Sequence, residues 1–195
     1  ESFRLIPDPI PYGRGTVWSS AIRNLADADA KVVVIDVMFD KPDHQTKNLS
    51  SYLESNKSKI NLDILDGDQE LLKSIEYAYS HESPTHVVLS GKRAVEENRI
   101  PSDYLLSPTE SLMNDEDQFS FGLVNVGNDS DGFIRRYPIF LPISGDSSLY
   151  YTLAIESVLA YNDYSSKKDI FLDLEKKLAT IGPLKIKTYG NTQII

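Results

Sequence analysis

Four consecutive β-branched residues, Val32-Val33-Val34-Ile35, restrict the folds open to this chain more than any other feature. Branching at Cβ favours the extended conformation, so we predict a strand over Lys31 to Phe39. The apolar run is continuous rather than alternating. We therefore expect both faces of this strand to be buried, as in a parallel sheet that is covered by helices.

Helical and extended patterns alternate around this strand. Apolar residues recur every three or four positions in three segments: Trp18 to Ala28, Leu71 to Tyr79 and Leu149 to Tyr161. Two further strands are expected at His86–Ser90 and Leu184–Thr188. This order predicts an α/β fold, a three-layer sandwich with a mixed, mostly buried central sheet that is flanked by helices.

The connecting segments are polar or irregular. We expect one domain over residues 1–195, with residues 40–67 as a polar loop or insertion that is rich in Lys, Asn, Ser and Asp. Asp68, which follows this loop, is the expected cap of the next helix. Residues 91–117 show no sustained period, so we predict an irregular excursion across the surface.

The segment from Phe121 to Pro138 combines an apolar strand, an Asp/Gly-rich turn and paired arginines. We predict a hairpin here. Because Pro138 cannot donate a ladder hydrogen bond, its strand should lie at an edge or end there. Two interpretations of Asp131-Gly132 remain open: a simple turn, or an acidic turn that shares a pocket with Arg135 or Arg136.

The composition excludes several classes of protein. With 20 Lys and Arg against 29 Asp and Glu, the net charge of −9 opposes nucleic-acid binding, which needs a basic face. The absence of cysteine excludes disulfides, thiolate catalysis and cysteine-bound zinc. The longest strongly apolar run, Val32–Ile35, is far shorter than a membrane span.

No catalytic, cofactor or metal motif is found in the sequence. The three histidines lack metal-site spacing, and there is no nucleophile elbow or nucleotide-binding glycine loop. Asp36 ends a predicted buried strand near Asp40 and Asp43, where it either lines an acidic cleft or accepts loop N–H groups. The run Asp129-Ser130-Asp131-Gly132 is similar to part of a calcium loop, but Pro138 replaces the terminal glutamate ligand.

Taken together, several segments resemble the type-two CHASE domain, the sensory extracellular domain associated with cyclases and histidine kinases. The resemblance covers roughly Ile10 to Ile195. It rests on a strand motif, a helix start, a central diagnostic segment and the helix that follows. These are Ala30–Phe39, Asp68–Leu71, then Gly122–Val126 with Asp129, Asp131-Gly132, Arg135-Arg136 and Pro138, and finally Leu153–Leu159.

The resemblance implies a non-catalytic domain on the periplasmic or cell-surface side of a bacterial membrane receptor. Flanking segments outside this chain would hold it in the membrane. An unknown small-molecule or protein stimulus would be relayed to an intracellular adenylate or guanylate cyclase, diguanylate cyclase or kinase. We expect a homodimer in the full-length receptor, and no nucleic acid, metal or cofactor.

Five residues are expected to border the sensing site: Asp36, Asn125, Asp131, Arg135 and Arg136. Two alternatives remain. One is a hydrolase that uses Asp36 with Asp40 or Asp131 as an acid and base pair, which needs carboxyl groups within roughly 5 to 10 Å. The other is a structural dimerisation module without a small-molecule ligand, which would show a large apolar interface.

Overall fold

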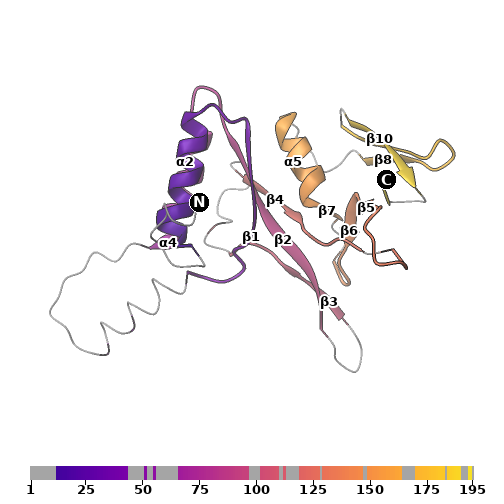
Figure 1. Cartoon of the computed structure of the whole chain (residues 1–195), viewed down its shortest axis with the longest axis horizontal. Coiled ribbons are helices and arrows are strands. Elements are labelled where there is room, and N and C mark those ends of the chain that lie inside the picture. The colour runs from indigo at the N-terminus through magenta and orange to yellow at the C-terminus, as the bar shows by residue number, and fades with distance from the viewer. Residues whose placement is uncertain are drawn as a thin grey trace. The chain divides into compact units, whose positions relative to one another are not determined.

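The computed structural model of this chain (Figure 1) describes residues 12–43, 51, 55, 66–96, 102–109, 112, 119–127, 129–146, 149–163, 170–182, 184–189 and 193–194. The chain divides into two compact units. Unit 1 comprises Glu1–Val33, Phe39–Val87 and Pro108–Phe119, and unit 2 comprises Val34–Met38, Val88–Ser107 and Ser120–Ile195.

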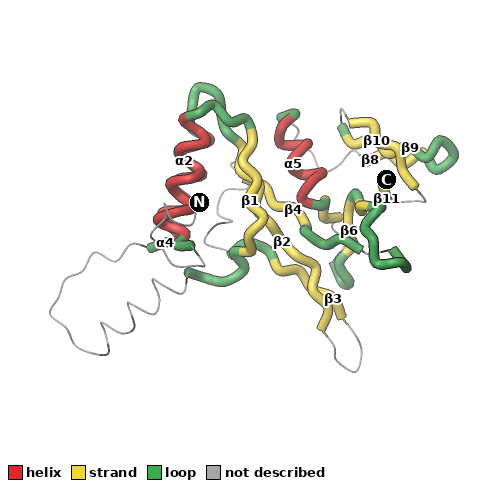
Figure 2. The backbone as a smooth tube through the Cα atoms, viewed as in Figure 1, coloured by secondary structure: helices red, strands yellow, loops and turns green. Residues whose placement is uncertain are grey.

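Unit 1 is built on a pair of packed helices. A single turn of π-helix, η1 (Arg14–Trp18), leads into α2 (Ser19–Asp27), and both contact α4 (Gly67–Tyr79) (Figure 2). The buried residues recur at helical spacing, which confirms both predicted helices. They are Ile22 and Ala26 on α2, and Leu71, Ile75 and Ala78 on α4.

Asp66, rather than the predicted Asp68, caps helix α4. The Asp66 carboxylate accepts hydrogen bonds from the N–H groups of Asp68 at 3.0 Å and Gln69 at 3.2 Å. These N–H groups have no partner within the helix, so the cap stabilises its first turn. The prediction was wrong by two positions because either aspartate could cap, and only the fold shows which backbone groups each one reaches.

Asp68 instead forms a buried ion pair with Arg14. Arg14 donates through Nη1 to Asp68 and through Nη2 to the Lys41 carbonyl at 2.6 Å, and its guanidinium lies 4.7 Å from the centre of the Phe39 ring. The second Asp68 oxygen accepts the N–H of Asp43 at 3.0 Å. The side chains of Arg14 and Asp68 are only 12% and 8% exposed. Loss of either partner would therefore leave a buried charge uncompensated.

We predict that Arg14→Ala lowers the free energy of unfolding by about 3 kcal/mol or more, because Asp68 stays buried without its partner. The double variant Arg14→Ala/Asp68→Ala should lose less than the sum of the single variants. Arg23→Ala is the matched control, because its longer, 3.6 Å pair with Glu70 is only partly buried and should contribute less than about 1 kcal/mol. Urea unfolding measures all four variants. Equal losses for Arg14→Ala and Arg23→Ala would contradict the prediction.

The four-stranded sheet, most of which belongs to unit 2, is organised around its longest strand, β2 (His86–Glu96). Three strands pair with it: β1 (Val32–Met38), β3 (Ser102–Leu106) and β4 (Phe119–Leu123). The β2–β3 pair is antiparallel, with Lys92 opposite Leu106. The predicted irregular excursion over residues 91–117 is therefore wrong where it covers the second half of β2 and all of β3.

The strand predicted at Lys31–Phe39 is confirmed, but its burial differs from the expectation. Val33 and Ile35 are buried, whereas Val34 is 44% exposed and Asp36 is exposed. Successive side chains of a strand point to opposite faces, so a continuous apolar run does not require two covered faces. Within this chain, β1 is buried on one side.

The C-terminal part of unit 2 contains a five-stranded sheet in the order β5-β11-β10-β9-β8. These strands are β5 (Tyr137–Pro138), β8 (Ile170–Asp173), β9 (Leu178–Ile181), β10 (Leu184–Tyr189) and β11 (Gln193–Ile194). Strand β5 lies at an edge and ends at Pro138, as predicted. The predicted hairpin is wrong, because β5 pairs with β11 and not with β4.

Helix α5 (Leu153–Tyr161) begins later than the predicted Leu149–Tyr161. The first residues of that span form β7 (Leu149–Tyr151), which pairs with β6 (Phe140–Pro142). The helix and these strands share one apolar core with β9, which holds this part of the unit together. Its buried members are Ile139, Tyr151, Ile155, Leu159, Ala179 and Ile181.

Gly122 allows β4 to approach the start of α5 closely. A Cβ atom at this position would lie 2.5 Å from the Cα of Leu153. The adjacent Leu123 forms a parallel bridge with Thr152. Glycine is required here because two backbones meet, not because of its φ angle.

We predict that Gly122→Ala lowers the free energy of unfolding by about 1–3 kcal/mol, because the added methyl group overlaps the α5 backbone. Gly127→Ala is the matched control, since a Cβ there meets no atom within 4 Å. It should change stability by less than about 0.5 kcal/mol. Denaturant unfolding distinguishes the two variants, and a Gly122→Ala protein as stable as its control would contradict the close approach.

The α/β class is confirmed by helices combined with mixed sheets. The three-layer order and the single domain over residues 1–195 stay predictions. Of the predicted polar loop, residues 40–67, most lie outside the described residues.

Candidate functional site

The segment between β4 and β5 is attached to β2 before it turns. Val124 donates its N–H to the Gly91 carbonyl at 2.9 Å. The Asn125 side chain accepts the Arg93 N–H at 2.6 Å and donates to the Arg93 carbonyl at 2.8 Å. Asn125 therefore pairs with β2 as a strand residue would, and this pairing fixes the start of the next turn.

The acidic turn that follows is held by local hydrogen bonds. Asp129 donates its N–H to the Phe133 carbonyl at 2.8 Å, and the Gly132 N–H donates to the Asp129 carbonyl at 2.8 Å. The Asp131 carboxylate accepts the Phe133 N–H at 3.2 Å. Gly132 has a φ of +82°, which glycine adopts without strain. The Asp-rich sequence thus closes a tight turn, as its composition predicts.

Arg135 is paired with both carboxylates of this turn. Its Nη1 lies 2.8 and 2.7 Å from the two oxygens of Asp131 and 3.6 Å from Asp129 Oδ2. The hydrogen bond from Arg135, and then the one from the Phe133 N–H, lower the pKa of Asp131 below its ordinary value. Asp131 is therefore ionised at neutral pH. The Arg135 guanidinium also lies 5.0 Å from the centre of the Phe133 ring.

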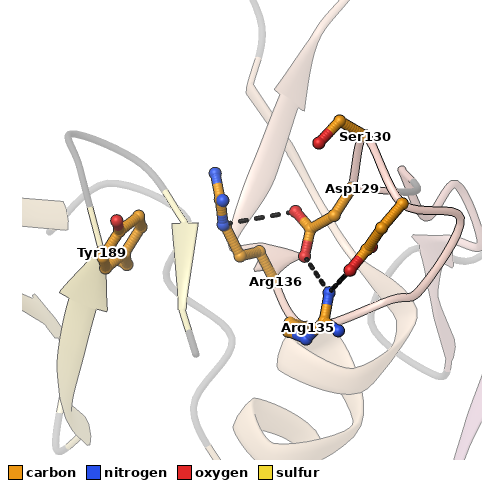
Figure 3. A pocket seen from close by; sticks show the side chains of 6 residues that line it. Asp129, Ser130, Arg135, Arg136 and Tyr189 are labelled. Carbon is orange, nitrogen blue, oxygen red and sulfur yellow. Dashed lines mark hydrogen bonds and ion pairs between the residues drawn. The ribbon is translucent and has the colours of Figure 1, made fainter.

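Arg136 is held more loosely and faces a different strand. Its Nε lies 3.3 Å from Asp129 Oδ1, and its guanidinium lies 4.8 Å from the centre of the Tyr189 ring. Tyr189 comes from β10, far along the chain. Figure 3 shows Arg136 between Tyr189 and the acidic turn. The Asp129 carboxylate thus receives one arginine at each oxygen.

These side chains surround an open pocket of about 410 Å³, a size typical of small-molecule sites. The formal charges of its lining cancel, because two guanidinium groups face two carboxylates. The lining residues are Asp129, Ser130, Asp131, Arg135, Arg136 and Tyr189.

Tyr137, the neighbour of Arg136, is partly buried and has a raised pKa. Removal from water is the main cause, and the negative charge of Asp36 raises it further. Hydrogen bonds with the Ala154 backbone and the Thr152 side chain act in the opposite direction. Asp36 on β1 is thereby linked electrostatically to the arginine segment, although it does not line the pocket.

The structure brings together three of the five residues expected at the site. Asp131, Arg135 and Arg136 line one pocket, whereas Asn125 pairs with β2 and Asp36 acts on Tyr137. Sequence reasoning missed the contribution of Tyr189. No local signal could have found it, because only the pairing of β5 with β11 and of β11 with β10 brings it near Arg136.

The described part of the chain shows neither a metal-binding cluster nor a helix that spans a membrane. No group of three or more His, Asp or Glu side chains there could hold a metal ion. No described helix is long and apolar enough to cross a membrane. The site is therefore characterised by its charged pocket, with the pairing of its arginines and aspartates as its main chemical feature.

The fold and the site define this chain as an α/β domain with a charged pocket at its surface. Residues 9–194 match the family model described as CHASE2 domain, and the chain belongs to this family. CHASE2 domains are sensory extracellular domains of signalling receptors, and the family is not catalytic. Comparisons with curated proteins and with solved structures gave no match. The resemblance inferred from the sequence is confirmed.

We predict that Asp36→Asn lowers the pKa of Tyr137, because it removes the nearby negative charge. A raised tyrosine pKa stabilises the folded state below the unfolded value of about 10, and this contribution is lost as the pH rises through the folded value. As the pH rises through this range, the free energy of unfolding of the Asp36→Asn variant should therefore fall less than that of the wild type.

Absorbance titration of tyrosinate measures this pKa, and Tyr137→Phe identifies the relevant component. Asp40→Asn is the control, because Asp40 does not contribute to the shift at Tyr137. An unchanged late-titrating component in Asp36→Asn would show that Asp36 does not act on Tyr137.

Proposed function

We propose that this chain is the extracytoplasmic sensory domain of a bacterial transmembrane receptor. It senses a small molecule and relays the stimulus to an intracellular adenylate or guanylate cyclase, diguanylate cyclase or kinase, as a homodimer in the full-length receptor. One observation carries the proposal: the segment on which the sequence resemblance chiefly rests, Gly122 to Pro138, contributes five of the six residues that line the charged pocket.

The proposed sensing site combines direct and supporting residues. Asp131, Arg135 and Arg136 contact the ligand, together with Asp129 and Tyr189. Asn125 supports the site by holding the chain against β2, whereas Asp36 lies outside the pocket lining and bears on the segment only through its charge near Tyr137. Asn125 thus positions the segment that carries the arginines.

The architecture of the pocket supports a role in transmission. One wall is the acidic turn, and the other is Tyr189 of β10, which is joined to the arginine segment through β11 and β5. A ligand can change a receptor's state only if it interacts differently with two arrangements. A molecule that contacts both the acidic turn and Tyr189 has an affinity that depends on the separation of these two walls.

The pairing of Asp131 with Arg135 disfavours Asp131 as the acid of the hydrolase alternative. An acid and base pair needs one carboxyl group with a raised pKa, whereas Arg135 and a backbone N–H lower the pKa of Asp131. Asp131 is therefore unsuited to donate a proton at neutral pH. The family's sensory character points in the same direction.

Thermal-shift screening tests the site with a library of small anionic, cationic, zwitterionic and neutral metabolites. At a hundredfold excess over Kd, a true ligand should raise the melting temperature of the wild type by about 5 °C or more. The rise should be reduced in Asp131→Ala, Arg135→Ala and Arg136→Ala. Arg23→Ala, which alters a partly exposed arginine of unit 1, is the matched control and should keep the full rise.

Two outcomes would contradict the proposal. Equal rises in the wild type and all three pocket variants would place the site elsewhere. If no compound stabilises the wild type while the protein forms a dimer with a large apolar interface, the structural dimerisation module is favoured instead. In the full-length receptor, the ligand found in this way should alter output activity, and Arg136→Ala should abolish that response.

A further inference from the structure

The pocket carries equal numbers of positive and negative groups at close range. Arg135 and Arg136 face Asp129 and Asp131, so the formal charges cancel within the lining. A ligand of one sign would meet repulsion from half of these groups. The chain's net charge of −9 further opposes the approach of a polyanion. A small molecule with both signs is the complementary ligand.

The two arginines are not equally available to such a ligand. Arg135 is committed to Asp131 by contacts of 2.7 and 2.8 Å, the range of strong charge-assisted hydrogen bonds. Arg136 contacts Asp129 only through Nε, at 3.3 Å. The Arg136 guanidinium also lies next to the Tyr189 ring. The terminal nitrogens of Arg136 can therefore donate to an incoming carboxylate.

Figure 3 supports this assignment, because the end of the Arg136 side chain extends past Asp129 into the space beside Tyr189. The Arg136 side chain is 44% exposed, so a ligand reaches it without displacing a buried group. A guanidinium presents a planar fork that matches a carboxylate with two parallel hydrogen bonds. The Tyr189 ring lies beside that fork, with its centre 4.8 Å from the Arg136 guanidinium carbon.

The acidic turn offers acceptors for the opposite charge. The Asp131 side chain is half exposed and, as an ionised carboxylate, has more lone pairs than the bonds from Arg135 and Phe133 occupy. The exposed Ser130 hydroxyl lines the same pocket. An ammonium group has three donors to satisfy, and these oxygens can accept them.

We propose that this pocket binds α-amino acids, with the carboxylate on the guanidinium of Arg136 and the ammonium group on Asp131 and Ser130. The volume of about 410 Å³ is at the small end of ligand sites and suits molecules of this size. The amino-acid side chain lies against the Tyr189 ring. This inference rests on the proposed function, in which the same pocket is the sensing site.

Calorimetric titration of the chain with each standard α-amino acid tests the proposal. At least one should bind with a Kd below about 10 mM. For the tightest binder, two analogues isolate the charges: its carboxamide lacks the carboxylate, and its deaminated acid lacks the ammonium group. Each should bind about tenfold more weakly or worse, since each loses one charge-assisted contact.

Variants connect binding to the assigned residues. Arg136→Ala should weaken binding by about tenfold or more, and Arg136→Lys should restore part of the loss because it keeps the charge without the fork. Arg23→Ala should bind as the wild type does. Far-ultraviolet circular dichroism checks that each variant is folded. If Arg136→Ala is unfolded, the weaker binding expected of Arg136→Lys relative to the wild type tests the contact instead.

The outcomes separate this inference from the proposed function. If no α-amino acid binds, or the deaminated acid binds as tightly as the amino acid, the ligand class is overturned. The sensing site itself still stands if the metabolite library yields another ligand whose effect Arg136→Ala reduces. If an amino acid binds equally well to wild type and Arg136→Ala, both the assigned contact and the proposed site are overturned.

Discussion

The main-chain hydrogen bonds of β2 hold the elements on which the rest of unit 2 depends. Strands β1, β3 and β4 all pair with it. The chain stays attached beyond the end of β4, through the Val124 N–H and the side chain of Asn125. Buried backbone groups must find partners, so these bonds determine where the acidic turn begins. The close approach of Gly122 to Leu153 then determines where α5 starts relative to β4.

Two kinds of ion pair serve different purposes in this chain. The Arg14–Asp68 pair is buried, so breaking it leaves an unpaired charge in a poorly solvated environment. The pair therefore holds η1 against α4. The pairs of Arg135 and Arg136 with the acidic turn lie in an open pocket, where water competes and each contributes little to stability. Local backbone bonds and Gly132, rather than these pairs, hold the turn. A ligand can therefore exchange with the exposed pairs without unfolding the site.

Much of the local structure was predictable because it depends on neighbours in the sequence. Helical periodicity identified α2 and α4, and the β-branched run identified β1. The turn at Asp129–Gly132 followed from Asp and Gly chemistry, and the edge position of β5 from Pro138. The wrong predictions concern tertiary contacts: which aspartate caps α4, how many faces of β1 are buried, and which strand pairs with β5. Each of these depends on residues that lie far away in the sequence.

The same division holds for the candidate site. The sequence alone determined the charged segment Asp129 to Arg136, its turn, and membership of the family of sensory domains. The tertiary structure decided that Tyr189 lies next to Arg136, that Asn125 is hydrogen-bonded to β2, and that Asp36 does not line the pocket. Turn chemistry is encoded in adjacent residues. The wall formed by Tyr189, in contrast, requires strand pairing. The order β5–β11–β10 forms only when segments that are distant in the sequence pair with one another.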